Sequence, residues 1–248
     1  MTDATTKPVV AVTGASRGIG HAIVREFYKQ GWDVITLARS PFSSVCPWAE
    51  GIVHHIKVDL SDPESVLEAS QSLHGMLDGR GLSALVNNAG ISPKIFGDQR
   101  MGAMDTPLST MQDVMQVNLI APLMLCQQMI DPLKAAKGAV VNVTSIAGIR
   151  VHPFAGAAYA MSKAALSALT RELAHELAPF GIRVNAVAPG EIETAILSAG
   201  TDKIVETQVP MKRLGRPEEV AEVVHFLASQ QSSYVTGSEI PINGGQHI

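Results

Sequence analysis

Tyr159 and Lys163 are four positions apart in a segment, 159–177, whose pattern predicts a helix. Residues four apart lie on one face of a helix, so the phenol and the ammonium group can meet at one site. Lowering a tyrosine pKa from near 10 to about 7 needs roughly 4 kcal/mol. A cation about 4.5 Å away supplies an energy of that order at an effective dielectric near 20. The pair can therefore serve as a general acid and base.

A glycine-rich stretch at 13–20, TGASRGIG, allows two interpretations. Residues 14–18 fit the G-x-S-x-G elbow of serine hydrolases, with Ser16 as the nucleophile. Three glycines, Gly14, Gly18 and Gly20, fit instead a turn that cradles a dinucleotide. Few residues precede Ser16, which leaves no room for the upstream oxyanion loop of a hydrolase, and no Gly-Lys-Ser/Thr of a Walker loop follows. The dinucleotide interpretation is favoured because the N–H groups and dipole of the following helix attract phosphate.

Short β-branched runs alternate with helical patterns along the chain. We expect strands at 9–13, 33–38, 52–58, 82–87, 139–144, 182–188 and 237–241, and helices at 18–30, 63–77, 107–135, 159–177, 192–208 and 217–229. This alternation predicts a single α/β domain over 1–248, with a Rossmann-like, doubly wound parallel sheet of about seven strands in three α/β/α layers. Residues 1–7 are expected to be flexible. The segment 40–51 contains two prolines and is expected to be a loop or a single turn.

Composition excludes several classes of protein. The chain is 46% hydrophobic and 17% charged, with a net charge of −4 and no basic run, so a nucleic-acid partner is not expected. No apolar run reaches the roughly 18 residues of a membrane span, and the polar start has no secretory signal. Cys46 and Cys126 are too few for a disulfide framework, which favours the cytoplasm. His54 and His55 should point to opposite faces of a strand, so no metal site is expected.

Taken together, these features resemble the short-chain dehydrogenase/reductase family over nearly the whole chain, and within it the NADP(H)-preferring members similar to 3-oxoacyl-carrier-protein reductases. The motifs are Thr13-Gly14-x-x-x-Gly18-x-Gly20, Asn87-Asn88-Ala89-Gly90, Asn118, Ser145, Tyr159-x-x-x-Lys163, and Pro189-Gly190 leading to Thr194. Singly, each motif could be a turn, a cap or a surface pair. Their order, at strand ends and helix starts where open α/β sheets bind ligands, makes a chance match improbable.

The resemblance implies hydride transfer between a nicotinamide cofactor and a carbonyl or secondary alcohol. Tyr159 would be the general acid and base, Lys163 would also hold the nicotinamide ribose, and Ser145 would orient the carbonyl oxygen. The implied cofactor contacts are Gly14, Ser16, Arg17, Gly18, Ile19, Gly20, Arg39, Asp59, Leu60, Asn88, Ala89, Gly90, Tyr159, Lys163, Pro189, Gly190, Ile192 and Thr194. The resemblance also implies a homo-oligomer, either a tetramer or a dimer.

Asn118 lacks the ordinary helical partner of its backbone carbonyl. In an α-helix the N–H of residue 122 bonds to the carbonyl of residue 118, but Pro122 has no N–H. In the family that the motifs resemble, this carbonyl holds a water that links the lysine to solvent. Asn118 is therefore expected to join Ser145, Tyr159 and Lys163 as a catalytic residue. An ordinary proline kink is the alternative.

The cofactor type depends on the end of the second predicted strand. An NAD site needs a carboxylate there to bind the ribose diol, but the residue is Ala38, and Asp33 lies at the other end of the strand. Arg39 follows, and Arg17 lies in the glycine turn. Two guanidinium groups favour a 2′-phosphate, so we expect NADP(H) to be preferred, with NAD(H) as the alternative.

The substrate is not evident from the sequence. Ser145 precedes Tyr159 by fourteen positions, where about thirteen are expected from the family, so the loop between them has an extra residue. His152 in that loop could contact substrate, although a solvated position is favoured. The segment 191–208 is expected to be a lid. A non-catalytic nucleotide sensor on the same fold is the alternative function, but it would be expected to lack Ser145, Tyr159 or Lys163.

Overall fold

The computed structural model describes residues 7–42, 46, 49, 53–95, 99–194, 198 and 200–248. The expectation for residues 1–7 falls outside this part of the chain except for its last residue. The expected loop at 40–51 is likewise described only at a few positions.

Seven parallel strands form one sheet, as the sequence predicts. In chain order they are β1 (Val9–Thr13), β2 (Asp33–Ala38), β3 (His54–Lys57), β4 (Ala84–Asn87), β5 (Ala139–Val143), β6 (Arg183–Pro189) and β7 (Glu239–Ile242). Their order across the sheet is β3-β2-β1-β4-β5-β6-β7, so the direction of winding reverses between β1 and β4. A reversal of this kind opens a crevice at the carboxyl ends of the strands, which is where such sheets bind ligands.

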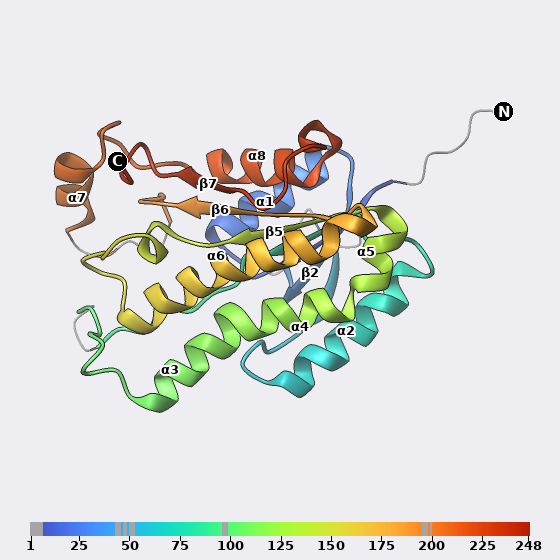
Figure 1. Cartoon of the computed structure of the whole chain (residues 1–248), viewed down its shortest axis with the longest axis horizontal. Coiled ribbons are helices and arrows are strands. Elements are labelled where there is room, and N and C mark those ends of the chain that lie inside the picture. Colours follow the sequence, from blue (N-terminus) through green and yellow to red (C-terminus); the bar gives the residue numbers. More distant parts are fainter. Residues whose placement is uncertain are drawn as a thin grey trace.

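Helices cover both faces of the sheet (Figure 1). On one face lie α1 (Gly18–Lys29) and α8 (Pro217–Ala228), and on the other lie α2 (Pro63–Leu77), α4 (Ala121–Gln128) and α6 (Ala157–Leu177). Three shorter helices are α3 (Leu108–Met115), α5 (Ile130–Ala136) and α7 (Thr201–Gln208). Alternate residues of β1 enter two separate apolar clusters, one on each side of the sheet. This arrangement confirms the three layers and explains why the strands are apolar without alternation.

The helix predicted at 107–135 is interrupted twice. Residues Gln116–Ile120 form a π-helical turn, in which the N–H of Ala121 bonds to the carbonyl of Gln116, five positions earlier. A second break at Met129 separates α4 from α5. Pro132 has no N–H for the carbonyl of Gln128, and that carbonyl is 2.9 Å from Nε2 of His74 instead.

The helix predicted at 192–208 begins only at Thr201. Gly200 precedes it with a φ of +91°, in the left-handed region that glycine adopts without strain. Residues Glu191–Thr194 are not helical, so the structure corrects the first half of this prediction. Among its described residues, the expected lid is helical over α7 and not at 191–194.

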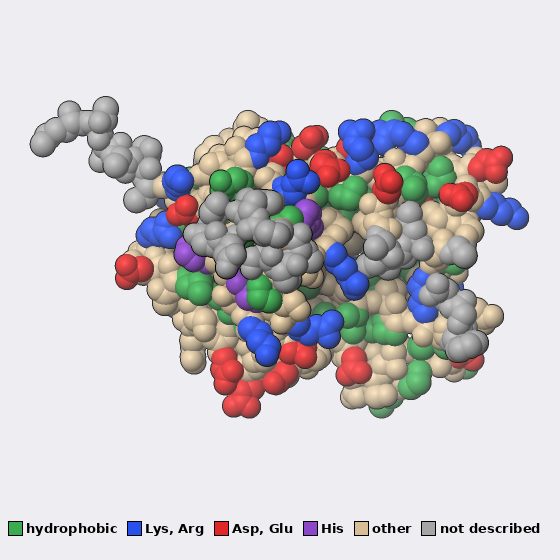
Figure 2. All heavy atoms as spheres, turned by 180° about the vertical axis from the view of Figure 1, so that it is seen from behind, with side chains coloured by type: hydrophobic (Ala, Val, Ile, Leu, Met, Phe, Trp, Pro, Cys, Tyr) green, Lys and Arg blue, Asp and Glu red, His purple; other side chains and the backbone are tan. Residues whose placement is uncertain are grey.

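The surface carries charges of both signs. On the face seen in Figure 2, basic and acidic side chains are interspersed. None of the helices within the described ranges is long and apolar enough to cross a membrane. Within the same ranges, no group of three or more His, Cys, Asp or Glu side chains could hold a metal ion.

Candidate active site

A cleft of about 590 Å³ lies at the carboxyl ends of the strands. Every cofactor-contact position expected from the sequence lines it: Gly14, Ser16, Arg17, Gly18, Ile19, Gly20, Arg39, Asp59, Leu60, Asn88, Ala89, Gly90, Tyr159, Lys163, Pro189, Gly190, Ile192 and Thr194. Ser145 lines the same cleft, whereas Asn118 lies behind its wall. Motifs far apart in the sequence are thus brought to one place.

Two polar side chains join the glycine turn to the end of β4. Thr13 Oγ1 accepts hydrogen bonds from the backbone N–H of Asn88 at 3.0 Å and of Ala89 at 3.1 Å. The Asn88 amide donates in return to the carbonyls of Thr13 and Gly14, each at 3.0 Å. A Cβ on Gly14 would lie 2.7 Å from Cα of Ala89, so only glycine allows this close approach.

The amino end of α1 is suited to a pyrophosphate. Arg17 is the N-cap residue, and its side chain makes no capping hydrogen bond. The first turn, which begins at Gly18, contains no acidic residue. Its N–H groups and the positive end of the helix dipole therefore face the cleft without a protein carboxylate to compete for them. The donor set fits the phosphates of a dinucleotide.

Two arginine side chains line the cleft. Arg39 follows Ala38 at the end of β2, and Arg17 lies in the glycine turn as the N-cap residue of α1. Neither forms an ion pair within 4.0 Å of a carboxylate in the described part of the chain. Asp59 is nearby, and hydrogen bonds from Ser61 are the largest cause that lowers its pKa, with the charge of Arg39 a smaller one.

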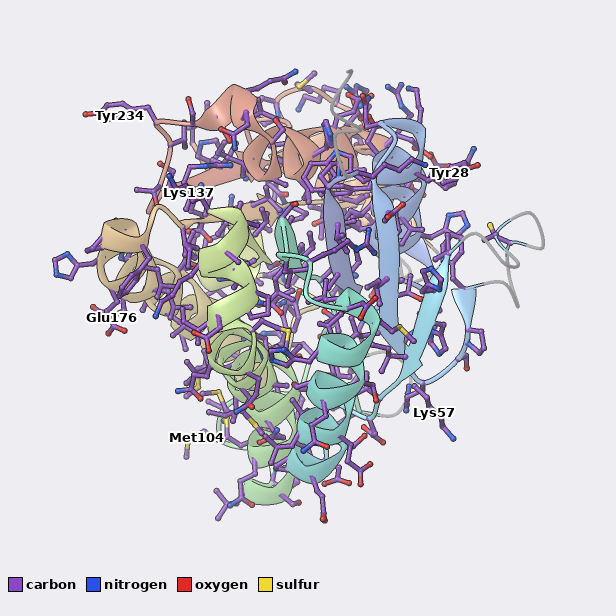
Figure 3. All side chains as sticks on the ribbon, turned by 90° about the vertical axis from the view of Figure 1, so that its right-hand side faces the viewer. Tyr28, Lys57, Met104, Lys137, Glu176 and Tyr234 are labelled. Carbon is purple, nitrogen blue, oxygen red and sulfur yellow. The ribbon has the colours of Figure 1, made fainter. Side chains whose placement is uncertain are left out.

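Tyr159 is the tyrosine of the cleft, and it is hydrogen-bonded to Ser145. Tyr28 and Tyr234, the other two tyrosines of the chain, project from the surface (Figure 3). Burial raises the pKa of Tyr159 above its ordinary value, and the hydrogen bond with Ser145 opposes that rise. Burial disfavours the charged phenolate. The chain alone therefore keeps this phenol protonated, whereas the sequence predicted a lowered pKa from the charge of Lys163.

Lys163 is almost completely buried, with 2% of its surface exposed. Its Nζ donates a hydrogen bond of 2.7 Å to the carbonyl of Val143 and lies 5.7 Å from the centre of the Tyr159 ring. Burial lowers the pKa of Lys163 to about 8. A Cβ on Gly90 would lie 3.3 Å from this nitrogen, so the Asn-Asn-Ala-Gly turn packs directly against the ammonium group.

Asn118 is fully buried in the π-helical turn. Its side-chain oxygen accepts from the N–H of Ile91 at 2.8 Å, and its amide donates to the Ile91 carbonyl and to Ser162 Oγ, both at 3.0 Å. Ser162 is the neighbour of Lys163. Pro122 has no N–H. It therefore cannot donate to the carbonyl of Asn118 in the α-helical register or to the carbonyl of Val117 in the π-helical register.

His152 does not occupy the solvated position favoured by the sequence analysis. Its Nε2 lies 2.6 Å from Oε1 of Glu191, and the two side chains are only 13% and 7% exposed. Both line the cleft. The extra residue in the loop between Ser145 and Tyr159 accompanies a turn in which the backbone N–H groups of Phe154 and Ala155 point to the imidazole.

The comparison with protein families agrees with this geometry. A family model described as enoyl-(acyl carrier protein) reductase matches residues 14–247. A crystal structure of a Brucella ovis oxidoreductase of the short chain dehydrogenase/reductase family, in complex with partially ordered NAD, is 55% identical, with a TM-score of 0.84 over 96% of this chain and all of that one. The chain belongs to the short-chain dehydrogenase/reductase family.

Two curated relatives are similar to this chain over nearly its whole length. Protein FixR of Bradyrhizobium diazoefficiens is 54% identical over 241 residues, covering 97% of this chain and 87% of its own. The 3-oxoacyl-[acyl-carrier-protein] reductase FabG of Aquifex aeolicus is 37% identical over 248 residues, covering 96% of each chain. The resemblance identified from the motifs is therefore confirmed at the level of the family.

The contacts made by two residues of this dehydrogenase/reductase site, Thr13 and Glu191, were not predicted from the sequence. Thr13 opens the TGxxxGxG motif, and its position before the first glycine is a signal that could have indicated a contact with the Asn88 turn. Glu191 follows Pro189-Gly190 directly. Only its pairing with His152, which is 39 positions away, distinguishes it from an exposed acidic residue.

Proposed function

We propose that the protein is an NADP(H)-dependent oxidoreductase that interconverts a carbonyl group and a secondary alcohol. The observation that carries the proposal is the joint position of Ser145, Tyr159 and Lys163 in the cleft that the glycine turn also lines. A nicotinamide bound beside them would supply or accept the hydride.

Tyr159 is the proton donor in the direction of carbonyl reduction. Because burial raises its pKa, the phenol holds its proton until negative charge develops on the carbonyl oxygen. Ser145 is hydrogen-bonded to the same phenol, and its hydroxyl orients the carbonyl oxygen. The positive charge of Lys163, whose Nζ lies 5.7 Å from the centre of the ring, stabilises the phenolate that remains.

Asn118 supports proton return to this site. Its side chain bonds to Ser162, the neighbour of Lys163, and Pro122 leaves its backbone carbonyl without the ordinary α-helical donor. A π-helical turn at this position suits a functional site rather than a simple kink. We infer that the carbonyl of Asn118 holds a water that relays protons to Lys163.

The preference for NADP(H) rests on Arg39 and Arg17. Both line the cleft, and the carboxylate that would bind a ribose diol is replaced by Ala38. A 2′-phosphate would pair with the guanidinium groups by charge-assisted hydrogen bonds. The Brucella ovis structure with NAD belongs to a chain 55% identical to this one, so the two cofactors must be compared directly.

The experiment that tests the function is a panel of ketones, aldehydes and secondary alcohols with NADPH, NADH, NADP⁺ and NAD⁺, followed at the nicotinamide absorbance. The proposal predicts turnover of at least one carbonyl–alcohol pair, with a higher kcat/KM for NADP(H). Binding of the nucleotide without turnover of any pair would favour the sensor alternative.

We also propose that the protein acts in the cytoplasm as a homo-oligomer, either a tetramer or a dimer. Cys46 and Cys126 are both free and buried, which suits a reducing compartment. The helix α6 exposes Met161 on its surface, and the chain ends in an exposed Ile248. Light scattering coupled to size-exclusion chromatography measures the mass of the assembly, and a monomer would contradict the proposal.

A further inference from the structure

Hydrogen bonds with its neighbours fix one tautomer of the His152 imidazole. Its Nδ1 accepts hydrogen bonds from the backbone N–H groups of Phe154 at 3.2 Å and Ala155 at 3.3 Å. Since Nδ1 is the acceptor, the other ring nitrogen, Nε2, carries a proton. That N–H points to Glu191 Oε1 at 2.6 Å. Both ring nitrogens of His152 are therefore hydrogen-bonded, and the imidazole holds the Glu191 carboxylate in position.

The carboxylate of Glu191 has a second support from the C-terminal segment. Gln246 is 1% exposed, and its amide nitrogen lies 3.3 Å from Oε1 of Glu191. Arg150 holds this segment in turn, because its guanidinium group donates to the Gln246 carbonyl at 2.6 Å. His152 and Gln246 both donate to Oε1 of Glu191, and no described residue donates a hydrogen bond to Oε2. The carboxylate cannot easily rotate away from the cleft that it lines.

Further polar side chains line the same cleft as His152 and Glu191, together with the apolar side chain of Phe154. The polar residues are Ser92, Lys94, Ser198 and Thr201. Lys94 is hydrogen-bonded to Ser198, and it lies 5.9 Å from the centre of the Phe154 ring. An apolar acyl chain buried here would remove water from these groups without replacing its hydrogen bonds, which is unfavourable.

We propose that the substrate is a small molecule that carries one or more hydroxyl groups besides its reacting carbonyl, and that Glu191, fixed by His152, is the specificity-determining residue that accepts a hydrogen bond from such a hydroxyl. This inference rests on the proposed function and names the substrate class for the same site.

The charges of the cleft favour a neutral polyhydroxy compound over a charged one. The carboxylate of Glu191 repels an anionic substrate, and the ammonium of Lys94 repels a cationic one. A hydroxyl group can donate to the carboxylate without a net charge of its own. Hydrogen bonds to charged groups are among the stronger ones, so a substrate that lacks the hydroxyl leaves Oε2 of a buried carboxylate without the hydrogen bond that the hydroxyl would donate.

The test compares substrates that share a carbon skeleton. Erythrulose and butan-2-one differ only in hydroxyl groups, and the N-acetylcysteamine thioester of acetoacetate serves as an acyl-type probe. Each is assayed with NADPH and with NADH, for the wild type and for Glu191→Gln. Glu193→Gln is the matched control, because Glu193 is an exposed carboxylate two positions along and does not line the cleft.

The wild type and Glu193→Gln are expected to favour erythrulose over butan-2-one by about tenfold or more in kcat/KM. In Glu191→Gln most of this preference is lost, through a higher KM for erythrulose with little change in the constants for butan-2-one. Equal or better turnover of butan-2-one or the thioester by the wild type, or an unchanged preference in Glu191→Gln, would overturn the inference alone. Absence of turnover for every carbonyl compound, with both cofactors, would refute the proposed function as well.

Discussion

The ammonium nitrogen of Lys163 donates a 2.7 Å hydrogen bond to the backbone carbonyl of Val143, the last residue of β5. Ser145 lies two positions beyond that strand end, and Tyr159 lies one helical turn before Lys163. The bond therefore ties α6 to β5 at the point where the serine and the tyrosine must meet. It also holds a cation in an almost completely buried position, so the free energy of unfolding should depend on the protonation of Lys163.

The stability of the protein should depend on pH through Lys163. Burial lowers the pKa of this lysine from 10.5 to about 8. Between these pH values the unfolded chain carries a proton that the folded chain has released, so the free energy of unfolding rises with pH by about 3 kcal/mol. Below pH 8 both states are protonated, and the folded state bears the full cost of burying the charge.

Lys163→Met isolates this contribution. Denaturant unfolding of the wild type and the variant is measured from pH 7.5 to 10.5, and the difference in unfolding free energy is plotted against pH. Groups common to both proteins, such as Cys126, cancel in the difference. The difference should rise in favour of the wild type across this range, and a flat plot would show that Lys163 is not charged and buried in the folded state.

Gly90→Ala should impair catalysis more than stability. The added methyl group would lie 3.3 Å from Nζ of Lys163, closer than most carbon contacts, and 3.4 Å from Oδ1 of Asn118. A displaced ammonium group should lower kcat by about tenfold or more, since small displacements at a site of this kind are costly. Gly75→Ala is the control, because nothing lies within 4 Å of a Cβ at that position. Equal kcat values for the two variants would contradict this account.

Asn118→Ala should destabilise the fold as well as the site. The side chain is fully buried, and its removal leaves the N–H and carbonyl of Ile91 and the hydroxyl of Ser162 without these partners. We expect a loss of about 2 to 4 kcal/mol in the free energy of unfolding. Thermal and denaturant unfolding measure it, and a loss below about 0.5 kcal/mol would mean that the π-helical turn does not depend on this side chain.

Arg39→Ala should reduce the preference for NADP(H) over NAD(H). Removing one of two guanidinium groups that face a 2′-phosphate should lower kcat/KM for NADPH by about tenfold or more and leave that for NADH nearly unchanged. Arg213→Ala is a suitable control, because Arg213 is paired with Glu219 and does not line the cleft. An unchanged ratio in Arg39→Ala would place the determinant of cofactor choice elsewhere.

Local patterns were sufficient to predict the sheet and the glycine turn after β1. The apolar runs of β1 and β4 are buried on both faces, and glycine spacing reflects a backbone approach that a side chain would block, as at Gly14. These signals are contained in a few consecutive residues. They predicted the seven strands, and the family was recognised from its ordered motifs.

Features that depend on distant partners could not be predicted in the same way. The sequence shows that Pro122 lacks an N–H, but it does not predict the π-helical turn. That turn is accompanied by hydrogen bonds from Asn118 to Ile91 and Ser162, which are 27 and 44 positions away. The position of His152 depends on Glu191. The pKa of Tyr159 was predicted from one charge at an assumed distance, whereas burial has the larger effect in the structure.

The most direct test of the central claim is single-turnover hydride transfer by Tyr159→Phe, with Tyr234→Phe as the matched control because Tyr234 is fully exposed. Nucleotide binding is measured on the same samples by quenching of protein fluorescence. The account predicts that Tyr159→Phe binds NADPH like the wild type but transfers hydride slower by about 10²-fold or more, while Tyr234→Phe is unaffected. Full hydride transfer by Tyr159→Phe would contradict it.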